Sequence, residues 1–542
     1  HGPPEVVGSL GTGSFNARHL DLGVRGGHDG FGYNPDLSDF HTDGFRAHSH
    51  AQRLNGNAKL DFTLGTGGKL TVLLNTVSLP EAQDPQGLTW QQFEADPAQA
   101  APSALTYNTR KSVHQSQAGA VYTQTIDEHQ SLRFMVYNGQ RTVQQFLSIP
   151  VTAQASPLSS GGVVDLATIY GGGDLRWTWQ GALGGRPLDF TTGLAYDWEN
   201  QHRLGYNDFV GNTLGVVGAL RRNEQDDVYN FDQYAQASWQ FAVPWSLMLG
   251  VRHSVVNFAS NDQYLTAANP GDSGRVSYGA TNPVAGLMYD VSAQWHLYAA
   301  YGAGFETPSF SELGYRPDAA SGLNFGLQPA HSHNAELGSK WRLADGARLD
   351  FAVFNADTRD EIAVLSSAGG RTIYQNVGRS ERRGAELGLH LPFANAWQFD
   401  VAYTYLQARF LDSFSTCTSA LACTVPADTR MPGVPRDLLH AQLRWGGNLG
   451  WHAGLSIDAA GAVSANDAGT LIAPGYAIAG VNAGYVTETP RYAIAPFLRV
   501  DNLFNQRYIG SVIVNQASGG SFEPAPGRNF WLGLNVRFRD SD

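Results

Sequence analysis

The chain has 542 residues, a formal net charge of −12 and a mean hydropathy of −0.25. The acidic balance excludes the basic face that binding of nucleic acid requires. No apolar stretch reaches the roughly 20 residues of a membrane-spanning helix, which excludes a helical membrane protein. Charged residues make up only 15% of the chain, against about 25% in soluble proteins, and aromatic residues make up 11%, which excludes a disordered chain.

The expected elements are strands with one apolar face. In chain order, the segments 58–64, 247–252, 397–405 and 530–538 place apolar side chains at every second position, with Trp531 as an exception in the last. This period of two indicates β-strands. Alternation alone fits two architectures: a soluble sandwich, in which the apolar face points to a core, and a membrane barrel, in which it points to lipid.

The connections between the expected strands decide between these architectures, because they alternate in length. Short turns are predicted at 28–30, 65–68, 127–130, 181–187, 243–245, 292–294, 344–347, 394–396, 446–450 and 487–491. Longer segments lie between them at 77–111, 150–160, 203–227, 259–274, 307–330, 411–436 and 511–527. Short periplasmic turns and long extracellular loops are typical of outer-membrane barrels. The pattern predicts an all-β fold, a transmembrane antiparallel β-barrel of about 22 strands with both termini in the periplasm.

Two cysteines, Cys417 and Cys423, lie in one of the long segments, within a stretch rich in Ser, Thr and Ala. They are either two unrelated thiols or a disulfide that closes a small extracellular loop. An exported barrel meets an oxidising compartment, so we predict the disulfide.

The end of the chain carries a recognisable set of motifs. Residues 501–508 read Asp-Asn-Leu-Phe-Asn-Gln-Arg-Tyr, residues 524–528 read Pro-Ala-Pro-Gly-Arg, and a last alternating strand ends at Phe538. This combination and its spacing resemble the C-terminal signature of TonB-dependent outer-membrane receptors. Further matching motifs lie at 304–308, 336–338, 374–378, 383–386 and 432–436, so the resemblance covers nearly the whole chain. We interpret the motif residues as architectural, because Gly and Pro at strand ends set turns and bulges.

The resemblance also implies a domain organisation. Receptors of this family carry a plug ahead of the barrel, with a short segment that pairs with TonB. Residues 2–6 look like the point where the plug hands over to the first strand. We therefore expect residues 1–4 to be a remnant of the plug–barrel linker, 5–538 the barrel and 539–542 a short periplasmic tail. The plug is expected to be absent from this chain, and TonB–ExbB–ExbD to be reached only through it.

What the resemblance implies about function is uptake across the bacterial outer membrane of a solute too large or too dilute for porins. The likeness is nearest to ferric-citrate and ferric-siderophore receptors, around 305–328 and 502–528, so we expect a ferric chelate as the ligand. A receptor for haem, cobalamin or another metal complex stays open as an alternative. We expect a monomer surrounded by outer-membrane lipid and lipopolysaccharide.

An anionic ferric chelate favours arginine, whose planar guanidinium matches a carboxylate with two parallel hydrogen bonds. The predicted extracellular segments supply both arginines and polar companions for them. The candidate substrate-binding residues are Arg316, Arg371 and Arg430, with Tyr315, Gln375 and Asn515.

Histidines gather near two predicted extracellular loops: His41, His48 and His50 near one, His331 and His333 near another. Imidazoles at such spacing can bind copper, zinc or haem iron. Solvated loop residues are the commoner explanation, so we assign neither a metal site nor a cofactor. Haem is disfavoured further because haem receptors resemble one another in a Phe-Arg-Ala-Pro box, and residues 305–308 read Phe-Glu-Thr-Pro.

The motifs of common enzyme classes are absent from the sequence, including the P-loop, the His-Glu-x-x-His zinc motif and the Gly-x-Ser-x-Gly elbow. We therefore expect no enzymatic activity. A hypothesis of another class, a passive pore or structural barrel without a plug, remains open beside the receptor.

Overall fold

A computed structural model describes residues 2–271, 273–318, 322–394, 396–417 and 424–539. Within these residues the chain forms a 22-stranded antiparallel sheet that closes on itself, because β1 pairs with both β2 and β30. This confirms the predicted architecture. The strands of the first half are β1 (Glu5–Gly13), β2 (Arg18–His28), β3 (Phe31–Thr42), β4 (Ala51–Leu64), β5 (Gly68–Gln83), β6 (Arg110–Thr125), β7 (Gln130–Phe146), β8 (Val163–Leu183), β9 (Arg186–Tyr206), β12 (Leu220–Ala242) and β13 (Trp245–Asp262). Those of the second half are β14 (Gly274–Ser292), β15 (Trp295–Glu306), β16 (Ala330–Arg342), β17 (Arg348–Ala368), β18 (Arg371–Phe393), β19 (Trp397–Phe410), β22 (Asp437–Trp445), β23 (Gly450–Ala460), β26 (Tyr476–Glu488), β27 (Tyr492–Asp501) and β30 (Asn529–Arg539).

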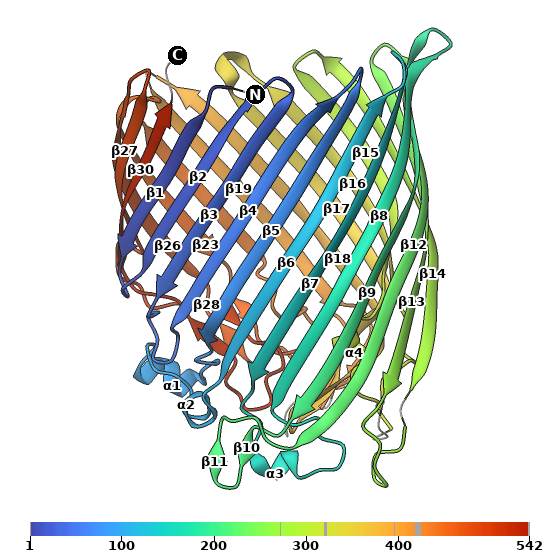
Figure 1. Ribbon diagram of the computed structural model, residues 1–542, viewed down its shortest axis with the longest axis vertical. Helices are drawn as coiled ribbons and strands as arrows, with labels where there is room; N and C mark the ends of the chain where they lie inside the picture. Colours follow the sequence, from blue (N-terminus) through green and yellow to red (C-terminus); the bar gives the residue numbers. More distant parts are fainter. Residues whose placement is uncertain (1, 272, 319–321, 395, 418–423, 540–542) are drawn as a thin grey trace.

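The two ends of the barrel differ as predicted. Both termini and the short turns lie at one end, drawn at the top of Figure 1, and the long loops lie at the other. All ten predicted turns fall between consecutive strands, for example Gly184–Gly185 between β8 and β9. Both of these glycines have positive φ, which L side chains adopt only at a cost. We call the end with the short turns the periplasmic rim and the other end the extracellular mouth.

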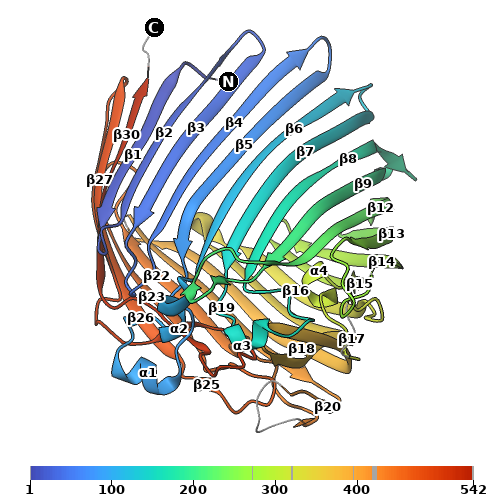
Figure 2. The ribbon, with the colours of Figure 1, turned by 60° about the horizontal axis from the view of Figure 1, so that its bottom comes forward.

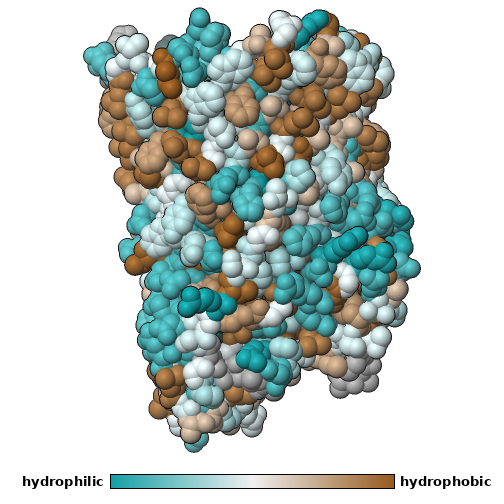
Figure 3. All heavy atoms as spheres, turned by 90° about the vertical axis from the view of Figure 1, so that its right-hand side faces the viewer, coloured by the Kyte–Doolittle hydropathy of each residue, from teal (hydrophilic) through white to brown (hydrophobic). Residues whose placement is uncertain are grey.

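The strands reach well beyond the membrane on the side of the mouth. About 9–11 residues span the hydrocarbon core, whereas β12 has 23. Its exposed aromatic side chains, such as Tyr229 and Phe231, begin some way into the strand. Figure 3 shows the same division over one face: apolar side chains gather toward the rim, and hydrophilic ones predominate toward the mouth. The predicted loop boundaries at 77–111, 203–227 and 259–274 were therefore too wide, because strand residues beyond the lipid no longer carry apolar side chains at every second position.

Short helices and hairpins gather at the extracellular mouth, as Figure 2 shows. They belong to the long connections between barrel strands. The helices are α1 (Trp90–Ala95), α2 (Pro102–Tyr107), α3 (Val151–Gln154) and α4 (Phe310–Leu313). The hairpins are β10 (Phe209–Val210) with β11 (Thr213–Leu214), β20 (Phe414–Ser415) with β21 (Thr424–Val425), β24 (Val463–Ser464) with β25 (Ile472–Ala473), and β28 (Ile509–Val512) with β29 (Phe522–Pro524). The 3-10 turn η1 (Ala344–Gly346) lies in a turn of the rim. Among the described residues, no helix is both long and apolar enough to span a membrane.

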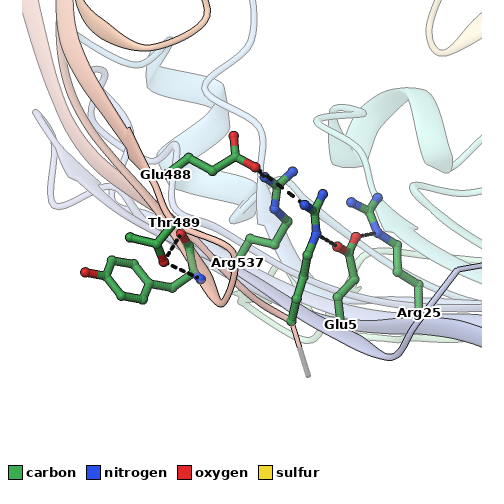
Figure 4. Close-up of polar contacts among 7 residues, drawn as sticks. Glu5, Arg25, Glu488, Thr489 and Arg537 are labelled. Atoms are coloured by element: carbon green, nitrogen blue, oxygen red, sulfur yellow. Dashed lines mark hydrogen bonds and ion pairs between the residues drawn. The ribbon is translucent and has the colours of Figure 1, made fainter. Parts of the chain in front are cut away.

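Where the barrel closes at the rim, a small network of charges flanks the ladder between β1 and β30. Glu5 accepts hydrogen bonds from Arg25 on one neighbouring strand and from Arg539 on the other, the latter at 2.9 Å. Glu488 accepts from Arg537 beside them (Figure 4). The final strand includes Arg539, one residue more than expected, because this arginine pairs in register with Glu5.

Candidate functional site at the extracellular mouth

A small cleft, open to solvent and lined mainly by polar residues, lies at the mouth. Five parts of the chain meet there. They are the loop 147–162, the starts of β12 and β18, the end of β13 with its following loop, and the loop 307–329. The polar residues that line the cleft include Ser160, Arg221, Arg222, Glu224, Asp262, Tyr264, Tyr315 and Arg371.

The loop 307–329 is fixed by a short capped helix and an apolar cluster. Ser309 caps α4, and its hydroxyl accepts a hydrogen bond from the backbone of Glu312. Leu313, at the end of α4, is fully buried in a cluster with Phe258, Tyr278 and two further leucines of the loop. Because Gly314 and Tyr315 follow directly, this packing sets where the Tyr315 ring lies.

Tyr315 is the centre of the cleft. Its hydroxyl lies 2.6 Å from the Oγ of Ser160, in the loop 147–162. The guanidinium of Arg371 lies 4.8 Å from the centre of the Tyr315 ring, and that of Arg222 lies 5.7 Å from it. Cations over an aromatic face are attracted by its electron density. The phenol ring therefore holds two positive charges close together, which is unfavourable unless an anion or a carboxylate balances them.

Carboxylates of the barrel wall provide part of that balance. Arg222 forms an ion pair of 2.7 Å with Glu224, and both side chains are more than nine-tenths buried. Strand register places Arg203 of β9 directly opposite Glu224, and Glu224 opposite Asp262 of β13. Asp226, two residues further along β12, is also fully buried. Arg222 is thereby tied to the wall by a carboxylate, whereas Arg371 has no ion pair and, at its buried Nε, no hydrogen-bond partner among the described residues.

Comparison with known proteins identifies the family. A family model described as TonB dependent receptor-like, beta-barrel matches residues 11–503. The chain belongs to this family. It is therefore an outer-membrane β-barrel of bacteria, as its apolar outer band requires.

Individual relatives are distant. The chain is 24% identical over 202 residues to a probable TonB-dependent siderophore receptor, PiuA, of Acinetobacter baumannii, covering 36% of this chain and 26% of that protein. It is 26% identical over 279 residues to an iron-regulated outer membrane virulence protein of Vibrio cholerae, covering 46% and 38%. The crystal structure of the ferric citrate transporter FecA in the unliganded form superposes with a TM-score of 0.82 at 16% identity, over 99% of this chain and 79% of that one. The chain thus matches well under half the length of these two curated relatives.

The six residues predicted from sequence are only partly brought together in this receptor barrel. Tyr315 and Arg371 meet in the cleft, as described. Arg316 is exposed next to it and pairs with Asp318 at 2.5 Å. Gln375, four residues along β18 from Arg371, donates a hydrogen bond to the backbone carbonyl of Ser415 instead.

The other two predicted residues lie in different loops. Arg430 is exposed, in a bridge opposite Arg409. Asn515 is buried, and its side chain makes two hydrogen bonds to Asp467, of 3.0 Å to the backbone nitrogen and 2.8 Å to the carboxylate. Burial raises the pKa of the Asp467 carboxyl above its ordinary range. Asn515 therefore ties two loops together.

Residues that sequence reasoning missed are Arg203, Arg222, Glu224 and Asp226. They fall in 203–227, which was predicted to be a loop. Their spacing, with Arg222, Glu224 and Asp226 at every second position, was the available signal: it is the polar, lumen-facing half of a strand.

The motif at residues 501–508 has a structural role, as we inferred from the sequence. Asn502 is buried, and its amide donates hydrogen bonds to the carbonyls of Gln506 and Pro526. Asn505 accepts one from the backbone of Arg528. Of the two cysteines, Cys417 lies on the surface and Cys423 lies outside the described residues, so the disulfide stays a prediction.

Proposed function

We propose that this chain forms the wall and extracellular mouth of a receptor that takes up an anionic ferric chelate. The observation that carries the proposal is the cleft in which Arg371 and Tyr315 meet beside Arg221 and Arg222. Arginine guanidinium groups bind carboxylates strongly when water is excluded. This class of ligand agrees with the similarity to PiuA, a probable siderophore receptor, and to FecA, a ferric citrate transporter.

Within the cleft we assign different parts to the arginines. Arg222 is held by Glu224, and Arg221 by the backbone carbonyls of Ser156 and Ser159. Arg371 is the arginine of the cleft without a carboxylate or backbone partner among the described residues, so we assign it and the Tyr315 hydroxyl to direct contact with the chelate. Arg316, at the edge of the cleft, assists by its charge. Arg430, Gln375 and Asn515 shape the surrounding loops.

Two competing functions have less support from the structure and the relatives. A haem receptor would place a histidine in the cleft. His333, however, shares a face of β16 with the exposed Leu337 and lies with its Nδ1 2.8 Å from the hydroxyl of Tyr301, itself exposed on β15. That pair points to the outside of the barrel. A passive pore has no support, because the family model and the relatives are receptors. We propose that transport is driven through TonB–ExbB–ExbD, as the family name implies.

The proposal is tested by titrating ferric citrate, and in parallel a ferric tris-hydroxamate and a ferric tris-catecholate, into the purified chain in detergent. Tryptophan fluorescence reports binding. Arg371→Ala should weaken binding of the preferred chelate about tenfold or more, since hydrogen bonds to charged groups contribute about 1.5–3 kcal/mol. Tyr315→Phe should have a smaller effect, and Arg316→Ala the smallest.

Arg379→Ala is the matched control, because Arg379 is an exposed arginine on the same strand that is tied to Asp412 at 3.1 Å. It should bind as the unaltered chain does. Failure of the unaltered chain to bind any of the three chelates would refute the proposed ligand class. Equal losses in the Arg371 and Arg379 variants would refute the assignment of the cleft.

A further inference from the structure

The loop between β3 and β4 brings two histidines and an aspartate to one point on the barrel, away from the cleft. His41 is the penultimate residue of β3, Asp43 begins the loop, and His50 ends it. The Nε2 of His41 lies 3.5 Å from the Oδ1 of Asp43, and the Nδ1 of His50 lies 3.7 Å from the same oxygen. The two imidazole rings meet edge to face, with their centres 4.8 Å apart.

We propose that His41, Asp43 and His50 form a binding site for one divalent transition-metal ion, with Zn²⁺ and Cu²⁺ as the best fits. Two imidazoles and one carboxylate are the donor set that such ions favour over Mg²⁺ or Ca²⁺. The three candidate ligand atoms lie within 4.8 Å of one another. Metal–ligand bonds of about 2.1 Å in a tetrahedral site put ligand atoms about 3.4 Å apart. Two of the three separations already approach that value, so small side-chain rotations complete the site.

The loop that carries the site is fixed by hydrogen bonds to a neighbouring loop. Arg46 is buried and donates hydrogen bonds to the backbone carbonyls of Pro85 and Gln99, in the neighbouring loop 84–109. The Nε2 of His48 lies 2.8 Å from the carbonyl oxygen of Thr109. His48 is thus committed to the scaffold and is not a ligand. A loop fixed in this way loses little freedom when an ion binds, which favours affinity.

Asp43 is oriented by its own partner. Its Oδ2 accepts a hydrogen bond of 3.2 Å from the amide of Asn16, in the loop between β1 and β2, and Asn16 is in turn bonded by Arg18. The Oδ1 is left facing the two histidines. Such outer partners orient carboxylate ligands in metal sites and contribute to affinity. The side chains of His41 and His50 are 32% exposed and that of Asp43 is 57% exposed, so an ion from solution can enter and keep a water ligand.

Histidine beside a carboxylate is common in this protein and is not by itself a site. His28 lies 2.8 Å from Asp29 in a turn of the rim, and His440 lies 2.6 Å from Asp458. Of the residues that the structure describes, the group at 41, 43 and 50 is the only one in which three such ligands converge. This group of three residues also lies apart from the chelate cleft, because it belongs to the β3–β4 loop and that loop does not line the cleft.

The test is calorimetric titration of ZnCl₂ into the purified full chain in detergent, with electron paramagnetic resonance of added CuCl₂ as a second measurement. We expect one ion per chain, and a copper spectrum that shows coupling to two nitrogens. His41→Ala and His50→Ala should each weaken binding by more than about 100-fold, because changes in outer partners alone cost about 10–100-fold. Asn16→Ala should fall within that outer range.

His28→Ala is the matched control, since it removes an exposed histidine that faces only one carboxylate, and it should bind as the unaltered chain does. Unchanged binding in His41→Ala and His50→Ala would overturn the proposal, as would an unaltered chain that binds neither ion stoichiometrically. Because both histidines are partly exposed, the variants should retain the barrel, which circular dichroism checks. Ferric-chelate binding should be unaffected in all of them, so the two proposals fail independently.

Discussion

Ion pairs between arginine and glutamate occur at both the periplasmic rim and the extracellular mouth, but those at the rim are more exposed to water. At the rim, Glu5 stands opposite Arg25 and Arg539 in register; its own side chain is 11% exposed, but those of the two arginines are 49% and 39% exposed. At the mouth, Arg222 and Glu224 pair on one strand with only 8% and 7% of their side chains exposed. Exposed ion pairs contribute little because water screens them. A buried pair, by contrast, is costly to break, since one charge stays behind without compensation.

This difference indicates what holds each end together. The rim is closed by the continuous backbone ladder between β1 and β30, and its charges add little to that. No such ladder runs across the described loops of the mouth, so packed clusters and buried charges fix their arrangement. We therefore expect stability to be insensitive to charge at the rim and sensitive to it at the mouth.

The largest expected effect is that of Arg222→Ala at the mouth. It removes the ion-pair partner 2.7 Å from the buried Glu224, which should cost about 3–5 kcal/mol of unfolding free energy. Arg25→Ala at the rim is the matched change and should cost at most about 1 kcal/mol. Guanidinium unfolding of the chain in phospholipid vesicles, followed by tryptophan fluorescence, measures both. Equal losses at the two ends would contradict the comparison.

A double variant sharpens this test. Arg222→Met with Glu224→Gln removes both charges of the pair and keeps the approximate volume. It should recover much of the stability that Arg222→Ala loses, because an apolar or neutral replacement of a buried ion pair is often close to neutral. If the double variant is as unstable as the single one, the cost lies in lost packing and not in an unpaired charge.

A smaller effect is expected in the β1–β30 ladder, toward its end at the mouth, where a tryptophan fills the space beside a glycine. Trp531 of β30 lies on the same side as Gly11 of β1, and a Cβ at Gly11 would lie 2.3 Å from the Trp531 ring. Gly11→Ala should therefore destabilise the barrel by about 1–3 kcal/mol, as overpacking does. In a Trp531→Ala background the same substitution should cost nothing. Gly286→Ala is the control, because its nearest neighbour would be 3.5 Å away.

Trp531 also shows how far the sequence reaches. It looked like an exception to the alternation of the last strand. Its neighbours Phe530 and Leu532 have side chains exposed on the outside of the barrel, so the Trp531 side chain, on the other face of the strand, points to the lumen. The turns were predictable because each depends on a few adjacent residues. The ends of the strands at the mouth were not predictable in this way. Beyond the membrane the alternating residues, such as Arg222, Glu224 and Asp226, are polar, so the apolar signal of a strand is missing there. Tyr315 and Arg371 were recognised as residue types, whereas their contact depends on the packing of Leu313 in a distant cluster.

The smallest expected effect concerns pH and lies in the loops of the mouth. Burial raises the pKa of Asp467, so the folded chain holds this proton more tightly than the unfolded chain does. The contribution of Asp467 to stability is therefore fully present in acid and is lost as pH rises through its folded pKa. Hydrogen exchange of the loop 461–475, corrected for the intrinsic dependence on pH, should show more protection in mild acid than at neutral pH. Asp467→Asn should abolish that difference and keep the bonds to Asn515, since a side-chain amide still offers an acceptor oxygen. The rim turn 489–491 should show no such gain, and an equal gain there would mean that acid stabilises the whole barrel and that the mouth is not distinguished by its buried charge.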